Sequence, residues 1–95
     1  MTQKLTIEEL LEEGMKTHAA HAFIKLQDLG CPVKTWYQND RGHFWIDSEE
    51  SSSEEFLDYW NTNLMFGSQV LTDVLEEHGL YFEWQNSAVA CVYDN

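Results

Sequence analysis

Apolar residues recur at spacings of three and four along the first third of the chain, which is the period of a helix that buries one face. Thr6, with Glu9 three residues later, forms a capping-box pattern that predicts where the helix begins. Gly30 predicts where it ends. The pattern indicates one helix over residues 7–29, with a bend or close packing at Gly14, because glycine inside a helix costs about 1 kcal/mol relative to alanine.

The next segment alternates apolar and polar residues, which is typical of strands. Residues 33–38 and 43–47 flank the turn sequence Asn-Asp-Arg-Gly and predict a β-hairpin. Both faces of this hairpin contain large apolar groups, so the pattern leaves open which one meets the helices. One face carries Val33, Thr35, Tyr37, Phe44 and Ile46, and the other carries Lys34, Trp36, His43 and Trp45.

A second helical pattern begins after residue 50. Ser52 and Glu55 form a second capping-box pattern, and helical spacing of apolar residues continues toward Gly79, the next helix stop. Residues 61–63 are weak helix formers, so we expect either a broken helix or two short helices, with Ser68 as the cap of the second. The apolar stripe of the first part consists of Phe56, Tyr59, Trp60 and Leu64.

Residues 80–85 and 88–93 predict a second hairpin around Asn86-Ser87, so the element order is αββαββ. We expect one α+β domain over residues 1–95, in which a four-stranded antiparallel sheet carries its helices on one face in two layers. Similar elements recur in residues 6–47 and 55–94, which suggests an internal α-β-β duplication.

Charge is distributed unevenly along the chain, whose net charge is −12. All five basic residues precede residue 42, whereas residues 42–95 contain eleven carboxylates and neither Lys nor Arg. Such a surface repels nucleic-acid phosphates and anionic lipids and attracts basic protein surfaces. Ordinary solubility is the alternative explanation for the acidic residues.

The densest acidic segment runs from Asp47 to Asp58 and also contains three consecutive serines. Glu54 and Glu55 suit the first turn of a helix, whereas no local structural role is predicted for Asp47, Glu49 or Glu50. Ser51, Ser52 and Ser53 lie in a context that acid-directed kinases favour, although helix capping explains them more simply. The candidate partner-binding residues are Asp47, Glu49, Glu50, Glu54, Glu55 and Asp58, a second cluster of Glu76, Glu77 and Glu83, and the aromatic Trp45.

Nothing in the sequence predicts catalysis, a cofactor or a metal site. His18 and His21 have a spacing that can place two imidazoles on one metal ion, but zinc sites need three or four ligands and the rest are not recognisable. His43 is a candidate for pairing with a carboxylate across the hairpin. Cys31 and Cys91 are expected to be buried thiols rather than a disulfide.

The aromatic residues allow two interpretations. A base-stacking platform requires a cationic groove, and the charge of this protein has the opposite sign. Exposed tryptophan or tyrosine side chains are instead good anchors for a protein interface.

We therefore expect a small non-enzymatic inhibitor of the DNA-mimic type, which blocks the basic nucleic-acid-binding surface of a host protein or defence complex, as in anti-restriction or anti-CRISPR action. The alternative is a housekeeping interaction module or assembly factor that uses exposed aromatic residues, its acids serving solubility. No apolar run approaches membrane-helix length and the first residues lack a secretory pattern, so the expected location is the cytoplasm of a bacterial host cell. The oligomeric state, monomer or homodimer, stays open.

Overall fold

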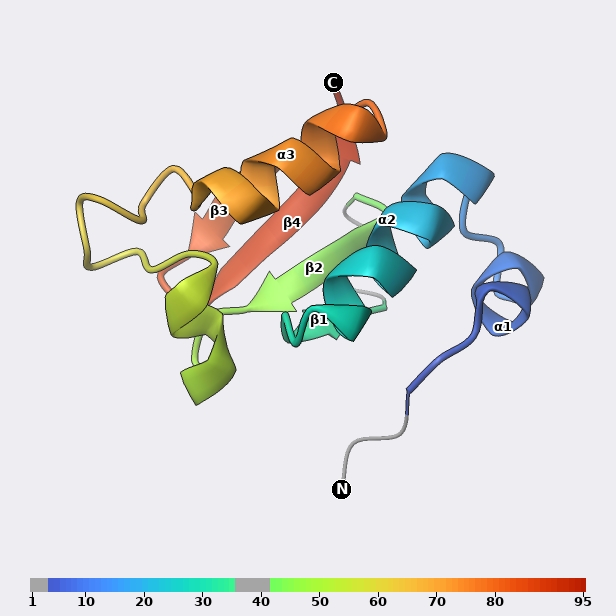
Figure 1. The fold of residues 1–95 in the computed structure, drawn as a ribbon, viewed down its shortest axis with the longest axis horizontal. Coiled ribbons are helices and arrows are strands. Elements are labelled where there is room, and N and C mark those ends of the chain that lie inside the picture. The colour runs from blue at the N-terminus through green and yellow to red at the C-terminus, as the bar shows by residue number, and fades with distance from the viewer. Residues whose placement is uncertain (1–3, 36–41) are drawn as a thin grey trace.

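Four strands form one antiparallel sheet in the order β1-β2-β4-β3 (Figure 1). The structure is a computed structural model that describes residues 4–35 and 42–95. The strands are β1 (Val33–Lys34), β2 (Phe44–Asp47), β3 (Leu80–Asn86) and β4 (Val89–Asp94). The predicted α+β class and four-stranded antiparallel sheet are confirmed.

The two hairpins join through their second strands, β2 and β4, which pair antiparallel with Trp45 opposite Cys91. The predicted hairpin of β3 and β4 is confirmed, with a register irregularity between Trp84 and Asn86. In the first hairpin, β1 pairs with β2 as predicted. The rest of its predicted first strand and the start of its turn, residues 36–41, lie outside the described residues.

The predicted helix over residues 7–29 is wrong, because the chain forms two helices, α1 (Ile7–Glu12) and α2 (Thr17–Asp28). Gly14 lies between them at φ 97°, a left-handed conformation that ends the first helix and that glycine adopts without steric cost. The capping box of Thr6 and Glu9 is confirmed. Met15, directly after Gly14, is buried in the core.

Residues 51–68 depart furthest from the predicted pattern. The 3-10 helix η2 (Ser51–Glu55) begins with Glu50 in the cap position, so the predicted cap at Ser52 is wrong. Phe56 is buried as expected, but residues 57–67 form no α-helix, because the Asp58 and Asn61 side chains accept hydrogen bonds from the backbone N–H groups two residues later. Such local bonds compete with helix formation.

The second short helix has the predicted cap. Helix α3 (Gln69–Glu77) begins after Ser68, whose hydroxyl accepts a hydrogen bond from the N–H of Leu71. It ends before Gly79, which has φ 71°. Of the two predicted short helices, the second, capped by Ser68, is confirmed; the first is wrong, because the structure has η2 followed by turns and loop over residues 56–68.

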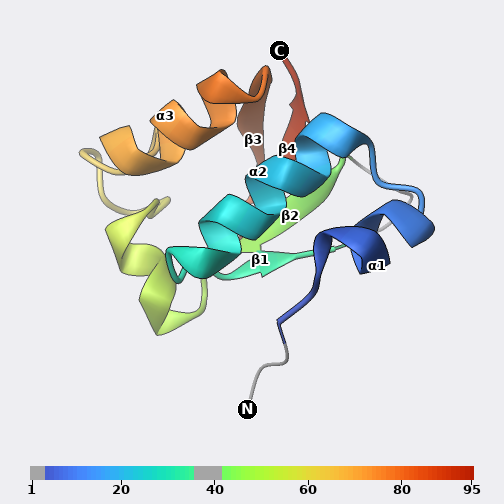
Figure 2. The ribbon, with the colours of Figure 1, turned by 45° about the vertical axis from the view of Figure 1, so that its right-hand side comes forward.

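Helices α2 and α3 lie over the same face of the sheet, and α1 packs beside α2 (Figures 1 and 2). Phe44 and Ile46 on β2 are fully buried beneath them, and the rings of Phe23 on α2 and Phe44 meet at 5.3 Å. The face that the sequence left undecided is therefore the one carrying Phe44 and Ile46. Trp45 lies on the opposite face and is half-buried. The predicted two-layer arrangement of sheet and helices and the predicted internal duplication of residues 6–47 and 55–94 remain predictions.

Cys31 and Cys91 are buried free thiols, as predicted. Within residues 4–35 and 42–95, no helix has the length and apolar character required to cross a membrane.

Candidate functional site

Residues 47–58, here called the acidic link, run from the end of β2 through η2 to the buried side chains of Phe56 and Leu57. Hydrogen bonds from two serine hydroxyls hold the acidic link in place. The Ser48 hydroxyl donates to the carbonyl of Ser87 at 3.0 Å, and the buried Ser53 hydroxyl donates to the carbonyl of Ser48 at 2.9 Å. Its exposed carboxylates therefore project from an anchored segment.

Three carboxylates of the acidic link have local partners. Asp47 accepts a hydrogen bond from the N–H of Glu49, and Asp58 accepts one from the N–H of Trp60, both at 3.0 Å. Glu50 forms an ion pair with Lys34 at 2.8 Å. Asp47 and Glu50 therefore have local partners that the sequence did not predict.

The other three, Glu49, Glu54 and Glu55, are exposed. In the part of the chain that the structure describes, they form neither hydrogen bonds through their carboxylates nor ion pairs. Because no neighbouring basic side chain pairs with them, these three carboxylates of the acidic link are available for ion pairs with basic side chains of a partner.

The residues of the second predicted cluster, Glu76, Glu77 and Glu83, do not lie together in the structure. Glu76 and Glu77 are exposed on α3, where Glu77 pairs with Lys25 at 3.0 Å. Glu83 on β3 accepts a hydrogen bond from the Tyr81 hydroxyl, which raises the pKa of Tyr81. Since Phe82 faces α3 and successive residues of a strand alternate sides, Glu83 lies on the opposite face of the sheet.

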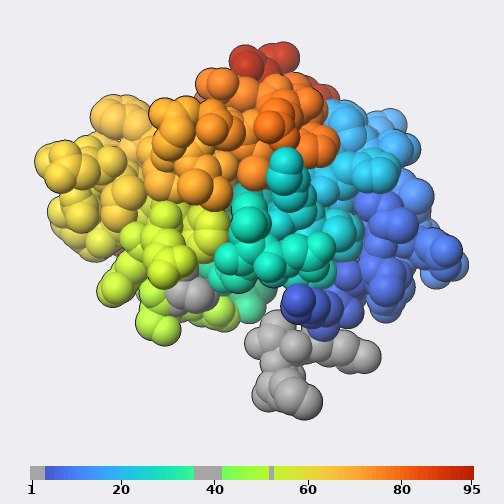
Figure 3. Space-filling view, in the orientation of Figure 1, coloured from blue at the N-terminus to red at the C-terminus, as the bar shows by residue number. Residues whose placement is uncertain are grey.

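An exposed aromatic pair follows the acidic link. Trp60 and Phe66 are 79% and 80% exposed, and both lie on residues 59–67, here called the aromatic loop. The loop adjoins α3 on one side of the molecule (Figure 3). The sequence placed Trp60 on a helix stripe and did not single out Phe66, whose exposure has no local signal.

The aromatic loop is packed against the edge strand β3. The Trp84 ring lies 5.3 Å from the ring of Tyr59, and the Trp84 indole N–H donates to the carbonyl of Met65 at 2.7 Å. Tyr59 in turn contacts Trp60, with ring centroids 5.1 Å apart. The exposed rings of Trp60 and Phe66 thus lie on a loop that contacts with β3 hold in position.

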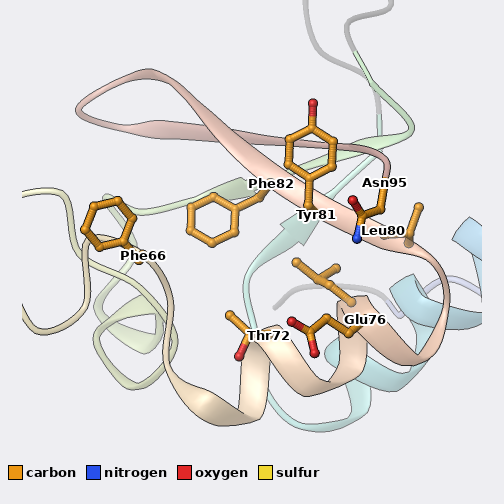
Figure 4. A pocket seen from close by; sticks show the side chains of 8 residues that line it. Phe66, Thr72, Glu76, Leu80, Tyr81, Phe82 and Asn95 are labelled. Carbon is orange, nitrogen blue, oxygen red and sulfur yellow. The ribbon is translucent and has the colours of Figure 1, made fainter.

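A groove of about 150 Å³ lies between α3 and β3, and Phe66 lines one end of it (Figure 4). Thr72 and Glu76 line it from α3, while Phe82 and Leu80 line it from β3. Since β3 is an edge strand, this α3–β3 groove borders a strand with one side unpaired by the sheet. Apolar walls and the Glu76 carboxylate together suit a partner with apolar and basic side chains.

A second cluster of chemical interest joins three distant segments. Asp94 Oδ1 lies 2.6 Å from Nε2 of His18 and 2.9 Å from Nε2 of His43. The hydrogen bonds from His18 and then from His43 lower the pKa of Asp94. The sequence did not predict this cluster, since the spacing of His18 and His21 gives no indication that Asp94 lies near His18. His43 does pair with a carboxylate, but across β2 and β4 rather than across the first hairpin.

No protein family, curated protein or solved structure matches the chain.

Proposed function

We propose that the protein is a small non-enzymatic inhibitor of the DNA-mimic type, which occupies the basic nucleic-acid-binding surface of another protein. The observation that carries the proposal is the adjacency of the acidic link and the aromatic loop. Glu49, Glu54 and Glu55 supply unpaired charge, and Trp60 and Phe66 supply exposed apolar area directly after them in the chain.

The electrostatic part of the proposal rests on the absence of Lys and Arg from residues 42–95. Carboxylates stand in for phosphates, which a DNA duplex presents at about one charge per 1.7 Å. Clustered charge of one sign speeds encounter with an oppositely charged surface and repels nucleic acid itself. Binding then excludes nucleic acid from the partner by direct competition.

The aromatic part supplies affinity that salt does not screen. Trp and Tyr dominate the binding energy of many interfaces when they enter pockets on the partner. Because the aromatic loop is packed on Trp84, little conformational freedom is lost when Trp60 and Phe66 become buried.

A second candidate function is favoured by the same exposed rings. In an interaction module or assembly factor, Trp60, Phe66 and the α3–β3 groove would carry the binding, and the carboxylates would serve solubility. The two candidates differ in salt dependence, since binding through charge weakens steeply with ionic strength and binding through aromatic rings does not.

The test is a competition experiment on partners captured from host lysate at low and high salt. Captured basic proteins are loaded with labelled DNA or RNA, and the protein is added. DNA mimicry requires that it displaces the nucleic acid and that displacement weakens as salt rises. Failure to displace nucleic acid from any captured partner, even at about 50 mM salt, contradicts the proposal.

Charge variants identify the surface. The triple variant Glu49→Gln, Glu54→Gln, Glu55→Gln is compared with Glu8→Gln, Glu12→Gln, Glu13→Gln, which removes the same charge from the region of α1. Mimicry through the acidic link predicts loss of displacement in the first variant only. Equal loss in both indicates dependence on net charge alone, and loss only with Trp60→Ala and Phe66→Ala favours the interaction module.

A further inference from the structure

The side chains of His18, His43 and Asp94 converge from three elements at one end of the sheet. His18 lies in the first turn of α2, His43 directly precedes β2, and Asp94 ends β4. One nitrogen of each imidazole and one carboxylate oxygen all lie within 4.8 Å of one another. Both rings direct Nε2 at the same oxygen, Asp94 Oδ1, and the rings meet edge to face at 5.3 Å.

Two imidazole nitrogens and a carboxylate oxygen form a donor set that Zn²⁺ accepts. A neutral imidazole carries its proton on one nitrogen only, so each ring offers a lone pair at Nε2 when the proton resides on Nδ1. Without a metal ion, the same Nε2 atoms hydrogen-bond to Asp94. A hydrogen-bonded state and a metal-bound state are therefore both open to these three side chains, and they use the same atoms.

Metal binding requires the donor atoms to rearrange. Donor atoms around a tetrahedral Zn²⁺ ion with bonds of about 2.0 Å lie roughly 3.3 Å apart, so the contacts of 2.6 and 2.9 Å to Asp94 must widen by less than about 1 Å. The two imidazole nitrogens, which lie within 4.8 Å of each other, must approach by up to about 1.5 Å. Asp94 can supply the widening, because its side chain is 63% exposed and lies at the end of β4. His43 is the more fixed ligand, since its side chain is only 18% exposed.

We propose that His18, His43 and Asp94 bind a divalent transition-metal ion such as Zn²⁺, with one coordination position left to solvent. The exposure of His18, 42%, leaves that position accessible to water or to a donor group of another molecule. The net charge of −12 adds a favourable field for a cation. A bound ion would tie the start of α2 to the central strands β2 and β4, and it would stabilise the folded state by mass action.

The experiment uses the protein of residues 1–95 stripped of metal with a chelator. Zn²⁺ binding is measured by titration calorimetry, and Co²⁺ serves as a spectroscopic probe whose visible absorption reports tetrahedral coordination. The expected result is one ion per chain and a rise of the unfolding temperature on adding Zn²⁺. His18→Ala, His43→Ala and Asp94→Asn should each weaken Zn²⁺ binding by at least about tenfold, the minimum loss seen even for residues that only support metal ligands.

His21→Ala is the matched control, because His21 lies on the same helix three residues from His18 and outside the cluster. It should bind Zn²⁺ as the unaltered protein does. NMR of the imidazole nitrogens gives a readout that folding defects do not imitate: Zn²⁺ should shift Nε2 of His18 and His43 but not of His21. Absence of binding, unchanged Nε2 signals, or equal losses in the His21 variant would overturn the proposal and leave a metal-free hydrogen-bonded cluster.

Discussion

The indole N–H of Trp84 donates a hydrogen bond to the backbone carbonyl of Met65, at 2.7 Å. This contact joins the edge strand β3 to the aromatic loop and sets where Trp60 and Phe66 are exposed. The surface proposed to bind a partner thus depends on a side chain that is not itself part of that surface.

Replacing Trp84 with Phe should destabilise the protein by about 1 to 3 kcal/mol, because it removes the donor for Met65 and part of the packing against Tyr59. Denaturant unfolding measures the effect. Trp60→Phe is the control, since the exposed Trp60 should change the free energy of unfolding by less than about 0.5 kcal/mol. Equal effects of the two substitutions would contradict the role assigned to Trp84.

Gly14→Ala tests the break between α1 and α2. A Cβ atom at Gly14 meets nothing within 4 Å, so the cost arises from the backbone conformation at φ 97° and not from a clash. We expect destabilisation of about 1 to 2 kcal/mol, with Glu13→Ala as the neighbouring control. Greater stability and increased helix content by circular dichroism would instead show that the chain can form the continuous helix that its periodicity suggests.

The carboxylates of the acidic link should separate into structural and binding groups. Asp58→Ala removes the acceptor for the N–H of Trp60 and should cost about 0.5 to 1.5 kcal/mol in unfolding free energy. Glu54→Ala, at an exposed carboxylate without a described partner, should leave stability nearly unchanged. Thermal unfolding of both variants checks this division, which fails if Glu54 proves as costly as Asp58.

The thiol of Cys31 should be inert in the folded protein near neutral pH. Burial raises the pKa of Cys31 from 9.0 to about 12, so at pH 8 only roughly one thiol in ten thousand is ionised. The neutral thiol is favoured in the folded state, so its contribution to stability is complete below pH 9 and is lost as pH rises toward 12. Iodoacetamide labelling with peptide mapping should modify Cys31 rapidly in urea and slowly without it; equal rates would contradict the burial.

Several elements could be predicted from sequence because their causes are local. The capping box of Thr6 and Glu9, the cap at Ser68 and the stop at Gly79 each depend on residues within one helical turn. The hairpin of β3 and β4 depends on alternation around a short turn. The acidic character of residues 42–95 likewise needs no structure to be recognised.

The α+β class, the antiparallel hairpins and the uneven charge follow from short-range periodicity and composition, so they could be predicted without a structure. The ion pair of Lys34 with Glu50 and the exposure of Trp60 and Phe66 depend instead on how the elements pack in three dimensions. The His18–Asp94 and His43–Asp94 contacts span 76 and 51 residues and arise because β2 pairs with β4 while α2 lies over them. Strand pairing at such separations is chosen by the packing of the whole core, which no local pattern encodes.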